Sequence, residues 1–239
     1  MYPQDQYDRT YSVPGRSGAI SFPAVMKNVY IWMALALAMT GLTAATVATQ
    51  PQIVAAIFGN QLLFWGLILA ELGLVIFLSA RIHAISFATA GIAFATYAIL
   101  NGVTLSGIFL VYTAASLAQT FFVTAGTFAA MAAVGLFIKK DLSAVGRFFY
   151  MALLGLIIAT VVNIFWQNSM LMSICNYAGV LIFTGLTAYD TQKIKNMLTQ
   201  MGDRRDESVM KLALLGSLTL YLDFINLFLY LLRFFGDRR

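Results

Sequence analysis

The last apolar segment of the chain, Leu212–Phe235, is long enough to cross a membrane and carries a carboxylate near its middle. Its 24 residues would form about 36 Å of helix, whereas the hydrocarbon core of a bilayer is about 30 Å thick. Asp223 lies near the midpoint of the segment. An ionised carboxylate at that depth costs at least about 3 kcal/mol unless another group compensates its charge. The fold must therefore give one side of this segment a protein or water environment.

The polar residues of Leu212–Phe235 share one face of the expected helix. At about 100° per residue they fall within a sector about 80° wide, and they are Thr219, Asp223, Asn226, Tyr230 and Arg233. A membrane helix with one polar face is expected to turn that face toward other helices or water rather than toward lipid. We therefore expect Leu212–Phe235 to be a central helix that the other segments surround.

Composition and hydropathy predict an all-α membrane protein with seven transmembrane helices. Hydrophobic residues make up 60% of the 239 residues and charged residues 10%, with a mean hydropathy of +0.81. The expected spans are Val25–Thr49, Leu62–Ala80, Ile85–Tyr112, Leu117–Ile138, Phe148–Trp166, Met170–Tyr189 and Leu212–Phe235. Residues 1–24 are polar and are predicted to be a disordered cytoplasmic tail, and residues 25–239 are predicted to form the transmembrane domain.

The distribution of positive charge predicts the orientation of the spans. Twelve of the fifteen Lys and Arg residues lie near or before the start of the first span, or in the loops after spans two, four and six. The loops on the other side contain none, and the remaining three lie at the end of the chain. Basic residues gather on the cytoplasmic side of membrane proteins. We therefore expect the N-terminus in the cytoplasm and the C-terminus outside it.

Three acidic residues on three different spans are the main candidates for function. In the expected orientation Glu71 and Asp223 lie near the middle of the membrane, and Asp190 and Arg81 lie near its cytoplasmic side. Intramembrane acids are rare and usually functional. Two carboxylates close together, such as Asp190 and Asp223, tend to share a proton. Arg81 could hold one of them ionised, which would make the three residues a pH-dependent latch between helices.

Carboxylate oxygens also suit a hard cation, so Asp190 and Asp223 are candidate transient ligands of Ca²⁺. The candidate residues of a cation path are Glu71, Asn226 and Asn101. Each acid has a structural alternative, in which neighbouring Asn, Ser, Thr or Arg side chains satisfy it and it fixes the register of its helix. Glu71, for example, could simply pair with Arg233 or Asn101.

The single cysteine and single histidine limit the chemistry of the chain. Cys175 lies in an apolar run and is the single cysteine, which excludes a disulfide framework and a cysteine-based metal site. His83 is the single histidine, which excludes a multi-histidine haem or di-iron site. The net charge of +5 reflects membrane topology rather than nucleic-acid binding. We expect no cofactor and no nucleic-acid partner. The expected partners are the lipid bilayer, Ca²⁺ and protons.

Gly126 and Ala130, four residues apart, predict a close helix contact.

Three motifs resemble the bacterial Bax inhibitor-1 (TMBIM) family of membrane proteins: GVTLSGIFLVYT (Gly102–Thr113), AYDTQKIK (Ala188–Lys195) and LYLDFINLFLYLLRFFGDRR (Leu220–Arg239). The similarity extends over the chain from about Met26. This resemblance implies seven helices, the last wrapped by the other six, in a bacterial inner membrane. It also implies a pH-sensitive Ca²⁺ leak, with paired aspartates on the last two helices linked to an arginine on the second. The matching positions are Asp190, Asp223 and Arg81.

A passive, proton-gated Ca²⁺ leak is therefore the favoured function. The main alternative is a regulator that transports nothing and modulates a membrane protease or translocon. We do not expect an enzyme. Tyr189–Asp190 matches one half of the signature of presenilin-type aspartyl proteases, but the Gly-x-Gly-Asp half is missing before Asp223. A retinal receptor needs a Schiff-base lysine in its last span, and Leu212–Phe235 contains none, which excludes that class. The chain also contains no P-loop, which argues against an active transporter.

Overall fold

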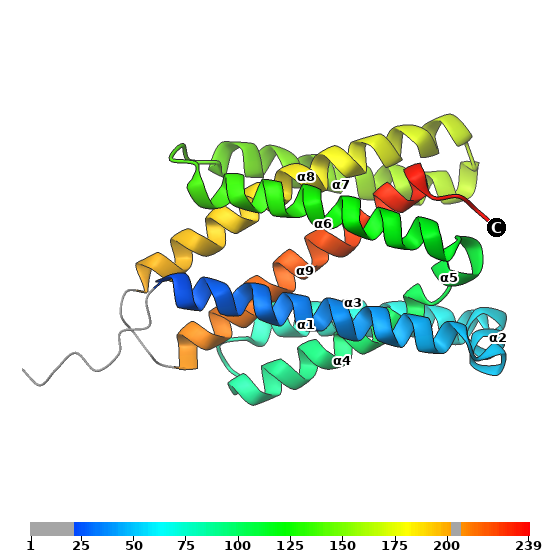
Figure 1. The fold of residues 1–239 in the computed structure, drawn as a ribbon, viewed down its shortest axis with the longest axis horizontal. Coiled ribbons are helices and arrows are strands. Elements are labelled where there is room, and N and C mark those ends of the chain that lie inside the picture. The colour runs from blue at the N-terminus through cyan, green and yellow to red at the C-terminus, as the bar shows by residue number, and fades with distance from the viewer. Residues whose placement is uncertain (1–21, 202–206) are drawn as a thin grey trace, which may run out of the picture.

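Helices form every regular element in the part of the chain that the computed structural model describes, residues 22–201 and 207–239 (Figure 1). In chain order they are α1 (Phe22–Ala48), α2 (Pro51–Gly59), α3 (Gln61–Arg81), α4 (Phe87–Leu105), α5 (Ile108–Val111), α6 (Ala114–Phe137), α7 (Ser143–Trp166), α8 (Ser169–Gln200) and α9 (Glu207–Phe235). Within these ranges seven segments are long and apolar enough to cross a membrane. The predicted all-α fold with seven spans is confirmed. Of the predicted tail, residues 1–21 lie outside the described residues, and residues 22–24 belong to α1.

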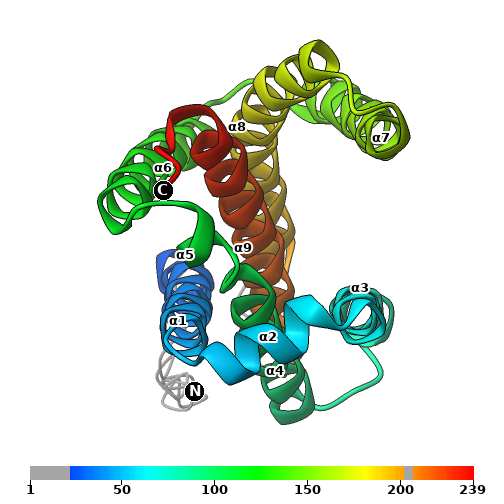
Figure 2. The ribbon, with the colours of Figure 1, turned by 90° about the vertical axis from the view of Figure 1, so that its right-hand side faces the viewer.

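Helix α9 is the central helix, as its polar face predicted. Its most apolar window is 67% buried, whereas the corresponding windows of the other six spans are 6–33% buried. It packs against α1, α4, α6 and α8. Figure 2 shows it running between the side of the bundle that holds α1 and α4 and the side that holds α6 and α8. Helices α3 and α7 lie outermost, packed on α4 and α8 respectively.

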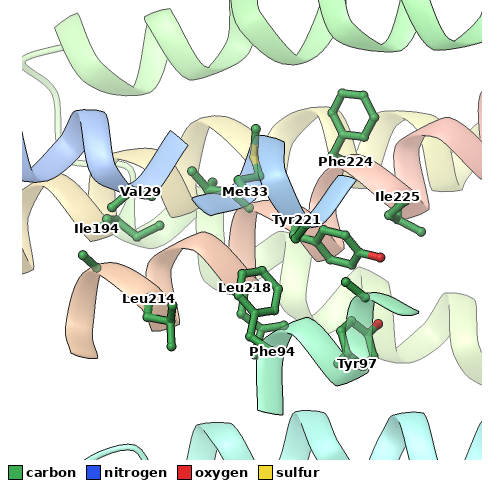
Figure 3. Close-up of a cluster of buried hydrophobic side chains, with 14 of the residues drawn as sticks. Val29, Met33, Phe94, Tyr97, Ile194, Leu214, Leu218, Tyr221, Phe224 and Ile225 are labelled. Carbon is green, nitrogen blue, oxygen red and sulfur yellow. The ribbon is translucent and has the colours of Figure 1, made fainter. Parts of the chain in front are cut away.

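Tyr221 lies at the centre of the largest buried cluster around α9 (Figure 3). Its ring meets the rings of Phe94 and Tyr97 on α4 edge to face, with 5.7 Å between centroids in each pair. Its hydroxyl lies 2.7 Å from Oγ1 of Thr40 on α1, and Thr40 donates to the carbonyl oxygen of Ala98 at 2.8 Å. Because Thr40 has one hydroxyl hydrogen, Tyr221 is the donor in their bond. One side chain of α9 therefore connects α1 and α4.

Two glycines let helices approach at backbone distance. A Cβ on Gly102 of α4 would lie 2.6 Å from the carbonyl oxygen of Thr40 on α1. A Cβ on Gly135 of α6 would overlap the carbonyl oxygen of Ala188 on α8. Small residues permit such contacts between membrane helices. Gly126, which the four-residue spacing placed in a helix contact, has no heavy atom within 4 Å of its Cβ position, so that prediction was wrong.

The helix boundaries differ from the predicted spans in three places. The predicted span Ile85–Tyr112 is divided into α4 and α5 by a turn, which continuous hydropathy could not reveal. The short helix α2 lies between the first two spans. Helix α8 continues to Gln200, eleven residues beyond the predicted end at Tyr189, because polar residues end a hydropathy peak without ending a helix. Asp190 therefore lies inside a helix rather than at its end.

The segment after α9 is bonded to the chain around α5 and α6. The backbone N–H of Thr113 donates to the carbonyl oxygen of Asp237 at 3.2 Å, and the N–H of Arg239 donates to that of Val111 at 2.9 Å. The N–H of Asp237 donates to Ser116 Oγ at 2.9 Å. The start of α1 and this segment lie at opposite ends of the bundle (Figure 1). Which end faces the cytoplasm stays a prediction.

Candidate functional site

A cavity of about 670 Å³ lies beside α9, and we call it the aspartate cavity. Its walls come from α4, α8 and α9 and from the two outermost helices, α3 and α7, which stand apart in Figure 2. Its polar lining residues are Glu71, Tyr97, Tyr150, Asp190, Thr219, Asp223, Asn226 and Tyr230, and the other lining residues are apolar. One cavity therefore collects acidic residues from three spans.

The polar face of α9 turns toward the aspartate cavity. Four of its five predicted members line the cavity wall: Thr219, Asp223, Asn226 and Tyr230. The fifth, Arg233, is exposed, with its guanidinium carbon 5.5 Å from the centroid of the Tyr230 ring. Helical periodicity thus located the cavity-lining face of α9 from the sequence.

Asp190 accepts a hydrogen bond from a phenol on the neighbouring helix. Its side chain is 1% exposed, and Tyr150 Oη on α7 donates toward both carboxylate oxygens, at 3.0 and 3.1 Å. The Tyr150 ring meets the Tyr189 ring edge to face, with 5.9 Å between centroids. Lys193 Nζ lies 6.0 Å from the Tyr150 centroid, a distance at which an ammonium is attracted to an aromatic face. Asp190 is therefore buried but has a donor and a nearby positive charge.

Asp223 is buried without an equivalent donor. Its side chain is 5% exposed, and no described residue forms a hydrogen bond with its Oδ2. It interacts electrostatically with Asp190 across the α8–α9 contact. A buried ionised carboxylate with an unsatisfied oxygen is costly, and a proton, a cation or water relieves that cost. Asp223 is thus the acid of this cavity that has a buried oxygen without a hydrogen-bond partner among the described residues.

Glu71 reaches the cavity from α3 and is half-buried. Thr104 Oγ1 on α4 donates to its Oε1 at 2.5 Å. Asn226 lines the cavity, but its Nδ2 donates to the carbonyl oxygen of Leu222 on its own helix at 2.8 Å. Asn101 does not line the cavity. The structure therefore brings Glu71 and Asn226 to the same cavity as the aspartates and leaves Asn101 out of it.

Arg81 is not brought to the aspartates. It is the last residue of α3, and its side chain is exposed. Ten residues separate it from Glu71, which corresponds to about 15 Å along the helix. Among the described residues one ion pair is found, between Lys211 Nζ and Glu207 Oε1 at 3.4 Å, and Arg81 is not part of it. The structure therefore does not bring Arg81 to the aspartates in this conformation, and its role in a latch stays a prediction. The observed hydrogen-bond partner of Asp190 is Tyr150.

Sequence reasoning missed Tyr150 and Thr104 as partners of the acids. Each lies on a different span from the acid it contacts, forty residues from Asp190 and thirty-three from Glu71. A tyrosine near a helix end usually belongs to the aromatic belt at the membrane interface. The sequence contains no local signal that separates Tyr150 from such a belt residue.

The described carboxylates do not form a ready-made metal shell. Among the described residues no three Asp, Glu, His or Cys side chains are close enough to hold one metal ion. Hydrated Ca²⁺ takes six to eight oxygen ligands and keeps water among them, so two carboxylates in a wide cavity can contact it without enclosing it. Asp190 and Asp223 stay predicted transient ligands, and the arrangement supports proton exchange as well.

Comparison with known proteins places this architecture in one family. The family described as "Inhibitor of apoptosis-promoting Bax1" matches residues 23–239. The inner membrane protein YbhL of Escherichia coli K12 is 47% identical over 236 residues, covering 98% of this chain and 100% of YbhL. An uncharacterized protein of Borreliella burgdorferi is 44% identical, covering 90% of this chain and 92% of its own length. An uncharacterized protein of Rickettsia prowazekii, RP147, is also 44% identical, covering 90% and 89%.

Proposed function

Because the chain belongs to the Bax inhibitor-1 family of membrane proteins, we propose that it is a passive cation leak of a bacterial inner membrane, with Ca²⁺ as its ion and protons as its gating signal. The location follows the name of the relative from Escherichia coli and the seven apolar helices. The proposal assigns no covalent chemistry to the aspartates. Their roles are to attract a cation and to exchange a proton.

The observation that carries the proposal is the unsatisfied oxygen of Asp223 in a cavity that two other acids share. Asp223 Oδ2 is buried without a hydrogen-bond partner among the described residues, and Asp190 and Glu71 line the same cavity. A purely structural acid in a membrane helix is expected to be paired or fully hydrogen-bonded. The unsatisfied oxygen of Asp223 therefore supports a role in stabilising a cation or a proton.

The gating step follows from the charge of the Asp190–Asp223 pair. When the two carboxylates share a proton, they attract each other and hold α8 and α9 together. When both are ionised, they repel each other, and the cavity attracts divalent cations more strongly. Ca²⁺ flux is therefore expected to rise as the pH rises. The hydrogen bond from Tyr150 to Asp190 supports a role for Tyr150 in this step, whereas Arg81 is exposed at the end of α3 and makes no ion pair with either aspartate in this conformation.

The test is Ca²⁺ influx into dye-loaded proteoliposomes between pH 5 and 8. Wild-type protein is compared with Asp190→Asn and Asp223→Asn, and with Asp237→Asn as a matched control whose exposed side chain lies outside the cavity. A pH-dependent flux that both cavity variants alter and the control preserves would support the leak. If well-folded protein carries no flux at any pH, the leak is refuted, and the regulator of a membrane protease or translocon becomes the better hypothesis.

A further inference from the structure

A second hollow, of about 690 Å³, lies between α1 and α6 and shares no lining residue with the aspartate cavity. Its apolar lining residues are Met26, Ile31, Ala34, Leu136 and Phe137. Two cationic residues, Lys27 of α1 and Lys195 of α8, line it together with Tyr30. We call this hollow the lysine groove.

The lysine groove forms because α1 and α6 both pack on α8. In both ribbon views α1 and α6 appear as neighbouring but separate helices (Figures 1 and 2). Lys195, from α8, therefore lies between them at the base of the groove. This residue belongs to the part of α8 that continues beyond the predicted span, so the groove could not be anticipated from hydropathy.

Lys195 is fixed in position but keeps unused hydrogen-bond donors. Its Nζ donates to the carbonyl oxygen of Leu136, near the end of α6, at 2.6 Å. An ammonium group has three donors, so two remain for a ligand in the groove. The side chain is partly buried, which reduces the entropy that binding must remove. The base of the groove thus presents a preoriented positive charge.

The groove changes from cationic to apolar along α1. Lys27, Ile31 and Ala34 lie on one face of the helix, at spacings of four and three residues, and span about 10 Å of its length. Ile31 is 42% exposed, and Phe137 on the opposite wall is 81% exposed. The groove therefore offers positive charge near the start of α1 and hydrocarbon surface deeper in the membrane.

No carboxylate among the described residues lines the lysine groove. A neighbouring hollow shares Leu136, Phe137 and Lys195 with the groove, and its lining includes Lys139 and Asp141. The carboxylate of Asp141 accepts bonds from the N–H and the hydroxyl of Ser143, and these bonds lower its pKa. The carboxylate of Asp141 is therefore engaged by the start of α7, and no described carboxylate neutralises Lys27 or Lys195 within the groove.

We propose that the lysine groove binds an anionic phospholipid. The headgroup phosphate lies between Lys27 and Lys195, and one acyl chain runs along Ile31 and Ala34 against Phe137. A soluble anion would satisfy the lysines but leave the apolar wall unmatched. A zwitterionic lipid would bring its own ammonium group toward two lysines, and the like charges would repel each other. The groove matches a molecule that combines net negative charge with a hydrocarbon chain.

The test is native mass spectrometry of the purified full chain with dioleoyl phosphatidylglycerol or dioleoyl phosphatidylcholine. We expect wild-type protein to retain one phosphatidylglycerol at least about five times more strongly than phosphatidylcholine, which corresponds to about 1 kcal/mol. Lys27→Gln and Lys195→Met are each expected to remove most of that preference. Arg147→Gln is the matched control, because Arg147 is exposed at the start of α7 and does not line the groove.

Lys27→Gln keeps the test independent of folding, since Lys27 is exposed and the bond between Lys195 and Leu136 remains intact. Equal retention of phosphatidylglycerol by wild type and Lys27→Gln of equal thermal stability would overturn the proposal, as would equal retention of the two lipids by wild type. Displacement of the lipid by millimolar inorganic phosphate would also overturn it, because the site would then recognise an anion without its acyl chain.

Discussion

The phenol hydroxyl of Tyr150 donates toward both carboxylate oxygens of Asp190, at 3.0 and 3.1 Å. This bond joins α7, one of the two outermost helices, to one half of the aspartate pair. A hydrogen bond to an ionised carboxylate stabilises the ionised form. In the proposed leak, Tyr150 therefore helps to set the pH at which the pair gives up its shared proton.

Replacing Tyr150 with phenylalanine removes this donor and keeps the ring that packs on Tyr189. Because ionised Asp190 loses a charge-assisted bond, we expect the pH of half-maximal Ca²⁺ flux to move upward by about one unit. Proteoliposome flux between pH 5 and 8 measures the shift. Tyr177→Phe is the control, since Tyr177 lies on α8 outside the cavity and packs on Phe234. An unchanged half-maximal pH would assign Tyr150 to packing alone.

Replacing Asp223 with asparagine removes one charge of the pair at nearly constant volume. We expect at least a tenfold loss of Ca²⁺ flux at pH 8 and a flat dependence on pH. The repulsion between two ionised carboxylates is also lost, so the unfolding temperature should exceed that of wild type at pH 8 and converge with it at pH 5. Flux and thermal unfolding in the same preparations check both effects. A lower unfolding temperature at pH 8 would show that the charge stabilises the fold.

Arg81→Gln tests which residue acts on the aspartates. The family resemblance implies Arg81, whereas the structure shows Tyr150 as the hydrogen-bond partner of Asp190. The exposed Arg81 side chain makes no ion pair with either aspartate. We therefore expect its removal to move the half-maximal pH of flux by less than about 0.3 units. That shift is well under the shift of about one unit expected for Tyr150→Phe. The two variants are measured side by side. A shift for Arg81→Gln as large as that for Tyr150→Phe would mean that α3 brings the arginine to the aspartates in another conformation.

Gly102→Ala tests the close approach of α1 and α4. The new methyl group would lie 2.6 Å from the carbonyl oxygen of Thr40 and 2.7 Å from Cβ of Thr43, so the helices must move apart. We expect a loss of about 1–3 kcal/mol in the free energy of unfolding. Gly126→Ala is the matched control, with nothing within 4 Å of the added group, and should be neutral or slightly stabilising. Denaturant titration in detergent compares the two.

The sequence alone was sufficient to predict the number of spans, the central position of α9 and the face of α9 that lines the cavity. These features depend on properties local to one segment, namely its length, its hydropathy and its period of 3.6 residues. Asp223 illustrates the point, because a single charge in a long apolar segment can only be accommodated on a protein-facing side.

Contacts between helices were not predictable in the same way. Whether Tyr150 or Arg81 meets Asp190 depends on how α3 and α7 rotate and tilt against their neighbours, and hydropathy contains no such information. Gly126 and Gly135 lie on the same apolar helix, and nothing in the sequence shows that only Gly135 faces α8. The polar end of α8 was missed for a different reason: it continues the helix through residues that look like a loop on a hydropathy scale.

The central position of α9 constrains how a cell can assemble this protein. A ribosome delivers the spans in chain order, so six helices enter the membrane before the helix around which they pack. Until α9 arrives, the aromatic surface of Phe94 and Tyr97 lacks Tyr221, and Asp190 lacks its neighbour Asp223. In the complete fold the early spans contact one another through α1 with α4 and through α6 and α7 with α8, so without α9 we expect them to form a bundle that is open at its middle. We therefore expect release of the final span from the translocon to commit the chain to its native state, and a chain arrested before that span to be recognised by membrane quality control.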